Sequence, residues 1–171
     1  MTAAGATFWL VLLVAAMVGI LLLRRWLASH PFGLPPLDVS PDDPLMKEAE
    51  ARARRALPTF LELVPHHPGS CYVKFAFESD SGAVEHLWAR VEGAEADGFA
   101  VRVETPPALH DGPFEPERTI PRSAVEDWQV ELEDGRIRGG YTLHAMFAIH
   151  RRDLGDVPKR FAEHEARYVD C

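Results

Sequence analysis

The sequence predicts an α+β fold, with an N-terminal transmembrane helix followed by one or two helices packed on a five- to six-stranded, mostly antiparallel sheet. Three observations support this prediction. The first 23 residues carry no charged side chain, residues 44–64 repeat apolar side chains at helical spacing, and apolar and polar residues alternate from Cys71 onward. Turn signals between neighbouring strands indicate antiparallel pairing, and a sheet curled toward a small barrel stays open as an alternative.

The apolar N-terminal segment, residues 1–27, is predicted to be a transmembrane anchor. Residues 3–23 would form a helix of about 30 Å, the thickness of the hydrocarbon core of a bilayer. A cleaved signal peptide would place its positive charges before the apolar run, whereas Arg24 and Arg25 follow it. A buried helix of a soluble domain would show a polar face, and this segment has none. We therefore expect residues 3–23 to contact the lipid bilayer.

The two arginines after the apolar segment also predict its orientation. Positive charge next to a span stays on the cytoplasmic side of a membrane, so we expect a single-pass protein of the cell inner membrane with its N-terminus outside and its domain in the cytoplasm. Cys71 and Cys171 are too few for a disulfide framework, which is compatible with a reducing compartment. The net charge of −8 argues against a nucleic-acid partner.

Residues 28–43 are predicted to form a Pro-rich linker, and helices open the domain that follows. Asp43 suits the N-cap of a helix whose first residue is Pro44. Apolar residues then recur on one helical face until Pro58, which is predicted to end this helix. A second short helix is expected to run to Val64.

Five or six short strands are predicted after these helices, and the first two form a hairpin. Their ranges are 71–77, 84–91, 99–103, 118–120, a strand that starts at 127, and 136–147. Gly139-Gly140 indicates a bulge or a close approach of another backbone segment in the middle of the last strand. The domain is predicted to cover residues 44–152, and residues 153–171 form a C-terminal extension with a candidate helix.

Short stretches of this domain, in order, resemble the DUF2314 family of bacterial proteins. The stretches are Tyr72-Val73-Lys74-Phe75-Ala76-Phe77, Glu85-His86-Leu87-Trp88, Asp127-Trp128 and Gly139-Gly140-Tyr141-Thr142. The resemblance implies a small α+β domain. It implies no catalytic residue and no cofactor, because the function of the family is unknown.

The candidate binding residues lie in these same stretches. They are His86, Trp88, Asp127, Trp128, Gly139, Gly140 and Tyr141. His86 could act as a base or ligand because imidazole titrates near neutral pH, but it also fits a half-exposed strand position. The two tryptophans with Tyr141 could line a groove or pack in the core.

Asp127 and the glycine pair also have structural interpretations. Asp127 suits a turn in which its carboxylate accepts backbone N–H groups. Gly139-Gly140 lacks the strand, glycine-rich turn and helix of a phosphate cradle, so no phosphate site is predicted.

The sequence favours a membrane-tethered binding or interaction module without catalysis, whose partner is an unidentified protein or small molecule. Two alternatives remain: a structural subunit of a membrane assembly, and an enzyme that uses His86 or His144 with a carboxylate from Glu85, Asp127 or Glu131. The histidines, serines and cysteines match no HExxH, GxSxG or paired-cysteine motif, so neither a metal nor another cofactor is expected.

Overall fold

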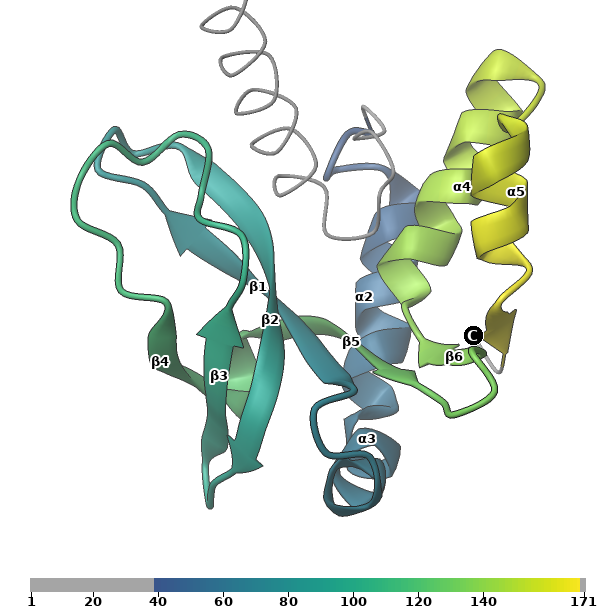
Figure 1. Ribbon diagram of the computed structural model, residues 1–171. Coiled ribbons are helices and arrows are strands. Elements are labelled where there is room, and N and C mark those ends of the chain that lie inside the picture. Colours follow the sequence, from purple (N-terminus) through teal and green to yellow (C-terminus); the bar gives the residue numbers. More distant parts are fainter. Residues whose placement is uncertain (1–38, 170–171) are drawn as a thin grey trace, which may run out of the picture. The chain divides into compact units, whose positions relative to one another are not determined.

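The computed structural model describes residues 39–169, which form a seven-stranded sheet with four α-helices (Figure 1). The predicted α+β class is confirmed for this part of the chain. The predicted anchor, residues 1–27, lies outside the described residues. Among residues 39–169, no helix has the length and apolar character needed to cross a bilayer.

The domain begins with two consecutive helices, as predicted. Helix α2 spans Pro44–Arg55, and the Asp43 carboxylate accepts the N–H of Leu45 at 2.9 Å. Helix α3 spans Leu57–Leu63 and is followed by the 3₁₀ helix η1 at Val64–His66. Pro58 lies in the first turn of α3, where the missing N–H costs no helical hydrogen bond, so the second helix starts earlier than predicted.

The strands form one open sheet with the order β4-β3-β2-β1-β5-β6-β7. All neighbours are antiparallel except β6 and β7. The bounds are β1 Cys71–Glu78, β2 Val84–Ala94, β3 Gly98–Val103, β4 Glu117–Pro121, β5 Val125–Glu131, β6 Ile137–Gly139 and β7 Tyr168–Val169. The 3₁₀ helix η2 at Arg122–Ala124 precedes β5. Because β4 and β7 are edges, the barrel alternative is wrong, and the sheet exceeds the five to six strands predicted.

The predicted strand at residues 136–147 is wrong. Strand β6 ends at Gly139, and helix α4 spans Tyr141–Leu154. Gly139 and Gly140 have φ angles of 82° and 72°, which end a strand and are easily adopted only by glycine. The predicted bulge is therefore a strand-to-helix junction.

Helices α2 and α3 cover one face of the sheet, where the core lies. Val73 faces Ala89 on one side and Trp128 on the other, and all three are buried. The Trp128 indole donates to the carbonyl of Ala53 on α2 at 3.0 Å, and its ring stacks on Phe60 of α3 at 5.1 Å. This face is occupied by the protein's own side chains.

The C-terminal extension contains helix α5 (Lys159–Glu165) and strand β7. Phe161 of α5 packs against Phe147 of α4 with ring centroids 6.1 Å apart. Figure 1 shows α4 and α5 side by side, with β7 returning to the sheet beside β6. The extension thus belongs to the same fold as the rest of the domain.

Candidate functional site

The strand register places Trp88, Lys74 and Asp127 in one row across β2, β1 and β5. Lys74 lies directly opposite Trp88 on one side and Asp127 on the other. Side chains alternate along a strand, so this row lies on the face opposite to Trp128. Directly opposed residues have Cβ atoms about 5 Å apart, which brings the three side chains together.

Asp127 connects this face of the sheet to α4. Its carboxylate is fully buried and accepts the N–H groups of Trp128 (2.8 Å), Tyr141 (3.2 Å) and Thr142 (2.7 Å) and the Thr142 hydroxyl (2.7 Å). Burial raises the pKa of Asp127 to about 6, and the hydrogen bonds and the Lys74 charge partly oppose that rise. The carboxylate therefore caps α4, which lacks a capping side chain at Gly140.

Lys74 lies at the bottom of a groove between the sheet and the starts of α2 and α4. Only 7% of the residue is exposed, and its ammonium donates to the Thr142 hydroxyl oxygen at 3.4 Å. We call this hollow of about 400 Å³ the Lys74 groove. Its polar and aromatic lining is Lys74, Thr142, His86, Trp88 and Glu50. Its apolar lining is Val39, Pro41, Met46, Val84, Leu143 and Met146.

The carboxylates around the Lys74 groove already have other partners. Glu126 accepts from His86 Nδ1 at 2.7 Å, and Glu50 pairs with Arg54 at 2.9 Å. Among residues 39–169, no carboxylate oxygen lies within ion-pair distance of the Lys74 ammonium. Within this range, the Lys74 ammonium therefore has no carboxylate in direct contact, and the charge of Asp127 reaches it through the Thr142 hydroxyl.

The other predicted residues lie outside this groove. Trp128 is in the core, and Tyr141 packs edge-on against it at 5.7 Å. Tyr141 and His144 line a separate hollow of about 150 Å³ between α2 and α4. A Cβ at Gly139 would overlap the Trp128 carbonyl, and one at Gly140 would overlap the Tyr168 ring, so both glycines serve packing. Of the seven predicted binding residues, only His86 and Trp88 line the Lys74 groove.

The acid–base pairs predicted for an enzyme do not form in the described part of the chain. Glu85 accepts the N–H groups of Ala108 (2.7 Å) and Leu109 (2.8 Å), and Glu131 pairs with Arg167. His144 lies 3.8 Å from Glu165, which was not among the predicted carboxylates. Within residues 39–169, no three His, Cys, Asp or Glu side chains converge as a metal site requires.

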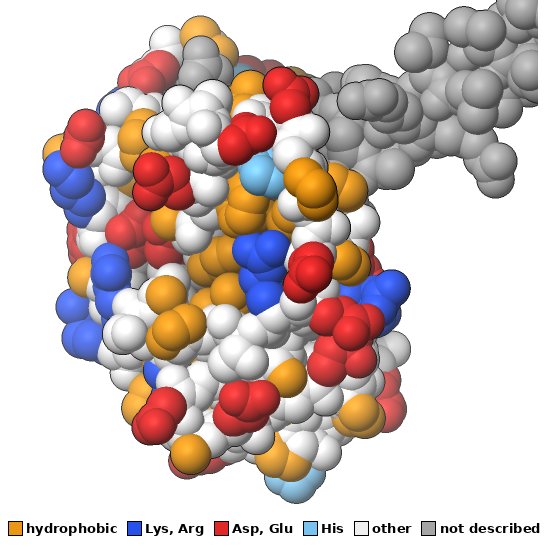
Figure 2. Space-filling model, turned by 90° about the vertical axis from the view of Figure 1, so that its left-hand side faces the viewer, with side chains coloured by type: hydrophobic (Ala, Val, Ile, Leu, Met, Phe, Trp, Pro, Cys, Tyr) orange, Lys and Arg blue, Asp and Glu red, His pale blue; other side chains and the backbone are white. Residues whose placement is uncertain are grey.

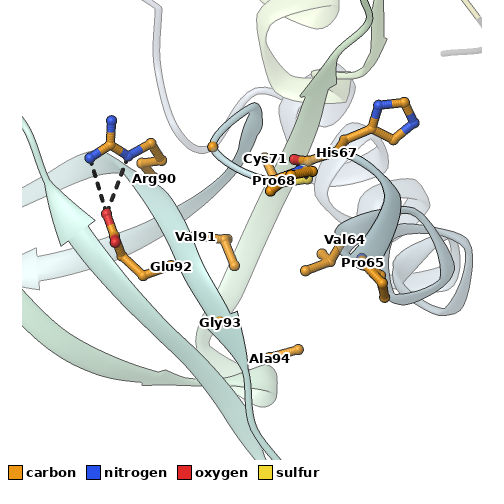
Figure 3. A pocket seen from close by; sticks show the side chains of 11 residues that line it. Val64, Pro65, His67, Pro68, Cys71, Arg90, Val91, Glu92, Gly93 and Ala94 are labelled. Carbon is orange, nitrogen blue, oxygen red and sulfur yellow. Dashed lines mark hydrogen bonds and ion pairs between the residues drawn. The ribbon is translucent and has the colours of Figure 1, made fainter.

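A second hollow, of about 580 Å³, lies between η1 and the end of β2. Figure 3 shows Val64 and Pro65 across this hollow from Val91 and Ala94. Its polar groups bind one another, since Arg90 pairs with Glu92 at 3.0 Å and the Cys71 thiol donates to the His67 carbonyl at 3.3 Å. Burial raises the pKa of Cys71 to about 11, which keeps the thiol protonated and unreactive. The Lys74 groove is therefore the stronger candidate.

The long loop between β3 and β4 is anchored by aromatic packing. Phe77 on β1 contacts the rings of His110 (5.4 Å) and Phe114 (5.7 Å), and the Arg118 guanidinium lies over Phe114 at 4.8 Å. Figure 2 shows the side of the molecule that carries β3 and β4, where hydrophobic side chains gather in a hollow beside basic ones, with acidic side chains around it.

Sequence reasoning missed Lys74, Thr142 and Glu126 as site residues. Alternation along β1 puts Lys74 on the face opposite to the core, but nothing in the local sequence indicates what covers that face. The sequence prediction lacked the helix that begins at Tyr141. This helix, α4, covers Lys74 and supplies Thr142.

Comparison with known proteins assigns the chain to a family. The model of the DUF2314 family, described as an uncharacterized protein conserved in bacteria, matches residues 43–154, which is more than half of the chain. The resemblance noted in the sequence is thereby confirmed. No curated protein and no solved structure gives a significant match. Every residue of the Lys74 groove except Val39 and Pro41 lies within the matched range.

Proposed function

Since the chain belongs to the DUF2314 family, an uncharacterized family conserved in bacteria, we propose from the geometry of its groove that it is a membrane-tethered ligand-binding module. The observation that carries this proposal is the Lys74 groove, a hollow of about 400 Å³ with apolar walls and a buried ammonium. Ligand pockets typically have about 300 to 1,000 Å³ and combine apolar walls with a few convergent polar groups.

Binding fits the Lys74 groove better than catalysis does. A general base must reach the proton it abstracts, and the Asp127 carboxylate already accepts four hydrogen bonds that hold α4. His86 is engaged with Glu126 at the rim of the groove. What remains available to a ligand is one buried charge and an apolar surface.

The tether in this proposal is residues 3–23, which are uncharged and long enough to span a bilayer. Arg24 and Arg25 support an orientation with the N-terminus outside and the domain on the cytoplasmic side of the cell inner membrane. A Cys71→Ser variant leaves Cys171 as the single thiol. We expect an impermeant maleimide to label this variant in lysed spheroplasts but not in intact ones. Labelling of intact spheroplasts would reject the orientation, and release of the chain by alkaline carbonate would reject the tether.

A blocking variant tests the binding function. Val84 lines the mouth of the Lys74 groove and is 56% exposed, so a Val84→Trp substitution fills the mouth without disturbing the core. Leu154→Trp is the matched control, because Leu154 is 72% exposed at the end of α4, outside the groove lining. The full chain in maltoside micelles is screened against a library of small metabolites by thermal shift.

We expect at least one compound to raise the melting temperature of the wild type and of Leu154→Trp, but not of Val84→Trp. A binder that stabilises all three proteins equally would place the site elsewhere. A library without any binder would reject the proposed function.

A further inference from the structure

We propose that the ligand of the Lys74 groove is a carboxylate on an apolar body, and that the carboxylate pairs with the Lys74 ammonium. This inference rests on the proposed function and specifies its ligand class. It concerns a molecule with one negative end and an alkyl or aryl remainder.

Lys74 has hydrogen-bonding capacity that the described residues do not use. The Thr142 hydroxyl gives its hydrogen to Asp127 at 2.7 Å, so its oxygen can only accept from the Lys74 ammonium, at 3.4 Å. An ammonium has three N–H donors, and Thr142 takes one of them. Only 7% of Lys74 is exposed, so the two remaining N–H donors need an acceptor that enters the groove.

The charges around the Lys74 groove favour a ligand with a single negative charge. A phosphate carries close to two negative charges and is usually held by Arg side chains or by free N–H groups at a helix N-terminus. At the start of α4, the N–H groups of Tyr141 and Thr142 are already bound to Asp127. Glu50 on the groove wall and Asp127 behind Thr142 would repel a second negative charge. A single carboxylate matches the single ammonium.

The apolar and aromatic side chains of the Lys74 groove favour an apolar remainder of the ligand. Met46 and Met146 line the groove from α2 and α4, and Val84 and Trp88 line it from β2. Methionine side chains are flexible and polarizable, and they adapt to apolar groups of different shape. The groove therefore selects the charged end of the ligand strictly and its apolar end loosely.

Isothermal titration calorimetry on the full chain in maltoside micelles tests the inference, with titrations into empty micelles subtracted. The probes are octanoate, octanamide and octyl phosphate, which share one alkyl chain and differ in the head group. The variant is Lys74→Met, and the matched control is Lys47→Met, because the Lys47 ammonium pairs with Asp42 on an exposed part of α2.

We expect octanoate to bind the wild type about 10- to 100-fold more tightly than octanamide, which is the usual value of a charge-assisted hydrogen bond. Lys47→Met should keep this preference, and Lys74→Met should lose it. Val84→Trp, which keeps Lys74, should abolish octanoate binding, so the test does not depend on the folding of the Lys74 variant.

Three results would overturn the inference: equal affinity for octanoate and octanamide, tighter binding of octyl phosphate than of octanoate, or no binding of octanoate. None of them by itself rejects the binding function. That function fails only if no library compound is sensitive to Val84→Trp. The ligand class and the existence of the site are thus tested separately.

Discussion

The Asp127→Asn variant should destabilise the domain at the junction between β5 and α4. In the native protein, one carboxylate oxygen accepts from the N–H groups of Trp128 and Tyr141, and the other accepts from the N–H and the hydroxyl of Thr142. An asparagine keeps one acceptor oxygen, but its amide NH₂ would face the N–H of Thr142. That N–H would then be buried without an acceptor.

The magnitude follows from these lost contacts. A hydrogen bond to a charged group contributes about 1.5 to 3 kcal/mol, and a buried donor without an acceptor costs about 1 to 3 kcal/mol. The Thr142 hydroxyl can rotate and accept from the new amide, which limits the damage. We therefore expect the free energy of unfolding to fall by about 2 to 4 kcal/mol, a large part of the 5 to 15 kcal/mol typical of a domain.

The assay is equilibrium urea unfolding of the full chain in maltoside micelles, followed by tryptophan fluorescence. Asp134→Asn is the matched control, because Asp134 accepts from the Arg136 N–H at 3.0 Å in an exposed turn. We expect it to cost less than about 1 kcal/mol. Hydrogen exchange should show faster exchange of the Tyr141 and Thr142 amides in Asp127→Asn alone. If Asp127→Asn has the stability of the wild type and its Tyr141 and Thr142 amides exchange hydrogen at unchanged rates, the capping role of Asp127 is refuted.

Three further predictions concern the same fold. Burial raises the pKa of Asp127 to about 6 in the folded state, so that state binds the proton more tightly than the unfolded chain, in which the pKa of an aspartate is about 4. The contribution of this residue to the free energy of unfolding is therefore fully present at about pH 3, below the unfolded pKa, and falls by about 3 kcal/mol as pH rises through the folded pKa to about pH 7. Urea titrations of wild type and Asp127→Asn across this range should differ by that amount, and parallel curves would contradict it. Gly139→Ala should lower the free energy of unfolding by at least about 3 kcal/mol, and Gly82→Ala by about 1 kcal/mol. Both glycines have φ near 80°, but only a Cβ at Gly139 meets other atoms, namely the Trp128 carbonyl and the Trp128 ring, with a ring carbon at 2.7 Å. Equal melting temperatures of the two variants would reject the proposed close contact. Glu85→Gln should speed hydrogen exchange at the Ala108 and Leu109 amides without lowering the melting temperature by more than about 3 °C, and unchanged exchange there would mean that Glu85 does not anchor the loop.

Local patterns in the sequence were sufficient for the first half of the sheet. The alternation in β1 and β2 and the turn between them predict the hairpin, and the apolar face of this alternation carries the buried Val73. Asp43 and Pro44 likewise predict where α2 begins. In these segments the residues that specify the structure are neighbours in the chain.

The prediction failed where the determining contact is distant in sequence. The strand expected at 136–147 is mostly α4, whose N-terminus is capped by Asp127 from another strand. The two-residue strand β7 has no periodicity to detect and is formed by parallel pairing with β6. The missing α4 also explains the incomplete site, because His86 and Trp88 were identified while the buried Lys74 beneath Thr142 was not.

Methyl NMR of the full chain, labelled at the methionine Cε atoms, tests the central claim most directly. The chain has four methionines, and two of them, Met46 and Met146, line the Lys74 groove. If the groove is the binding site, octanoate will shift both resonances in a saturable manner in the wild type and will leave them unshifted in Val84→Trp. If both resonances stay in place while octanoate binds, the groove is not the site and the account is contradicted.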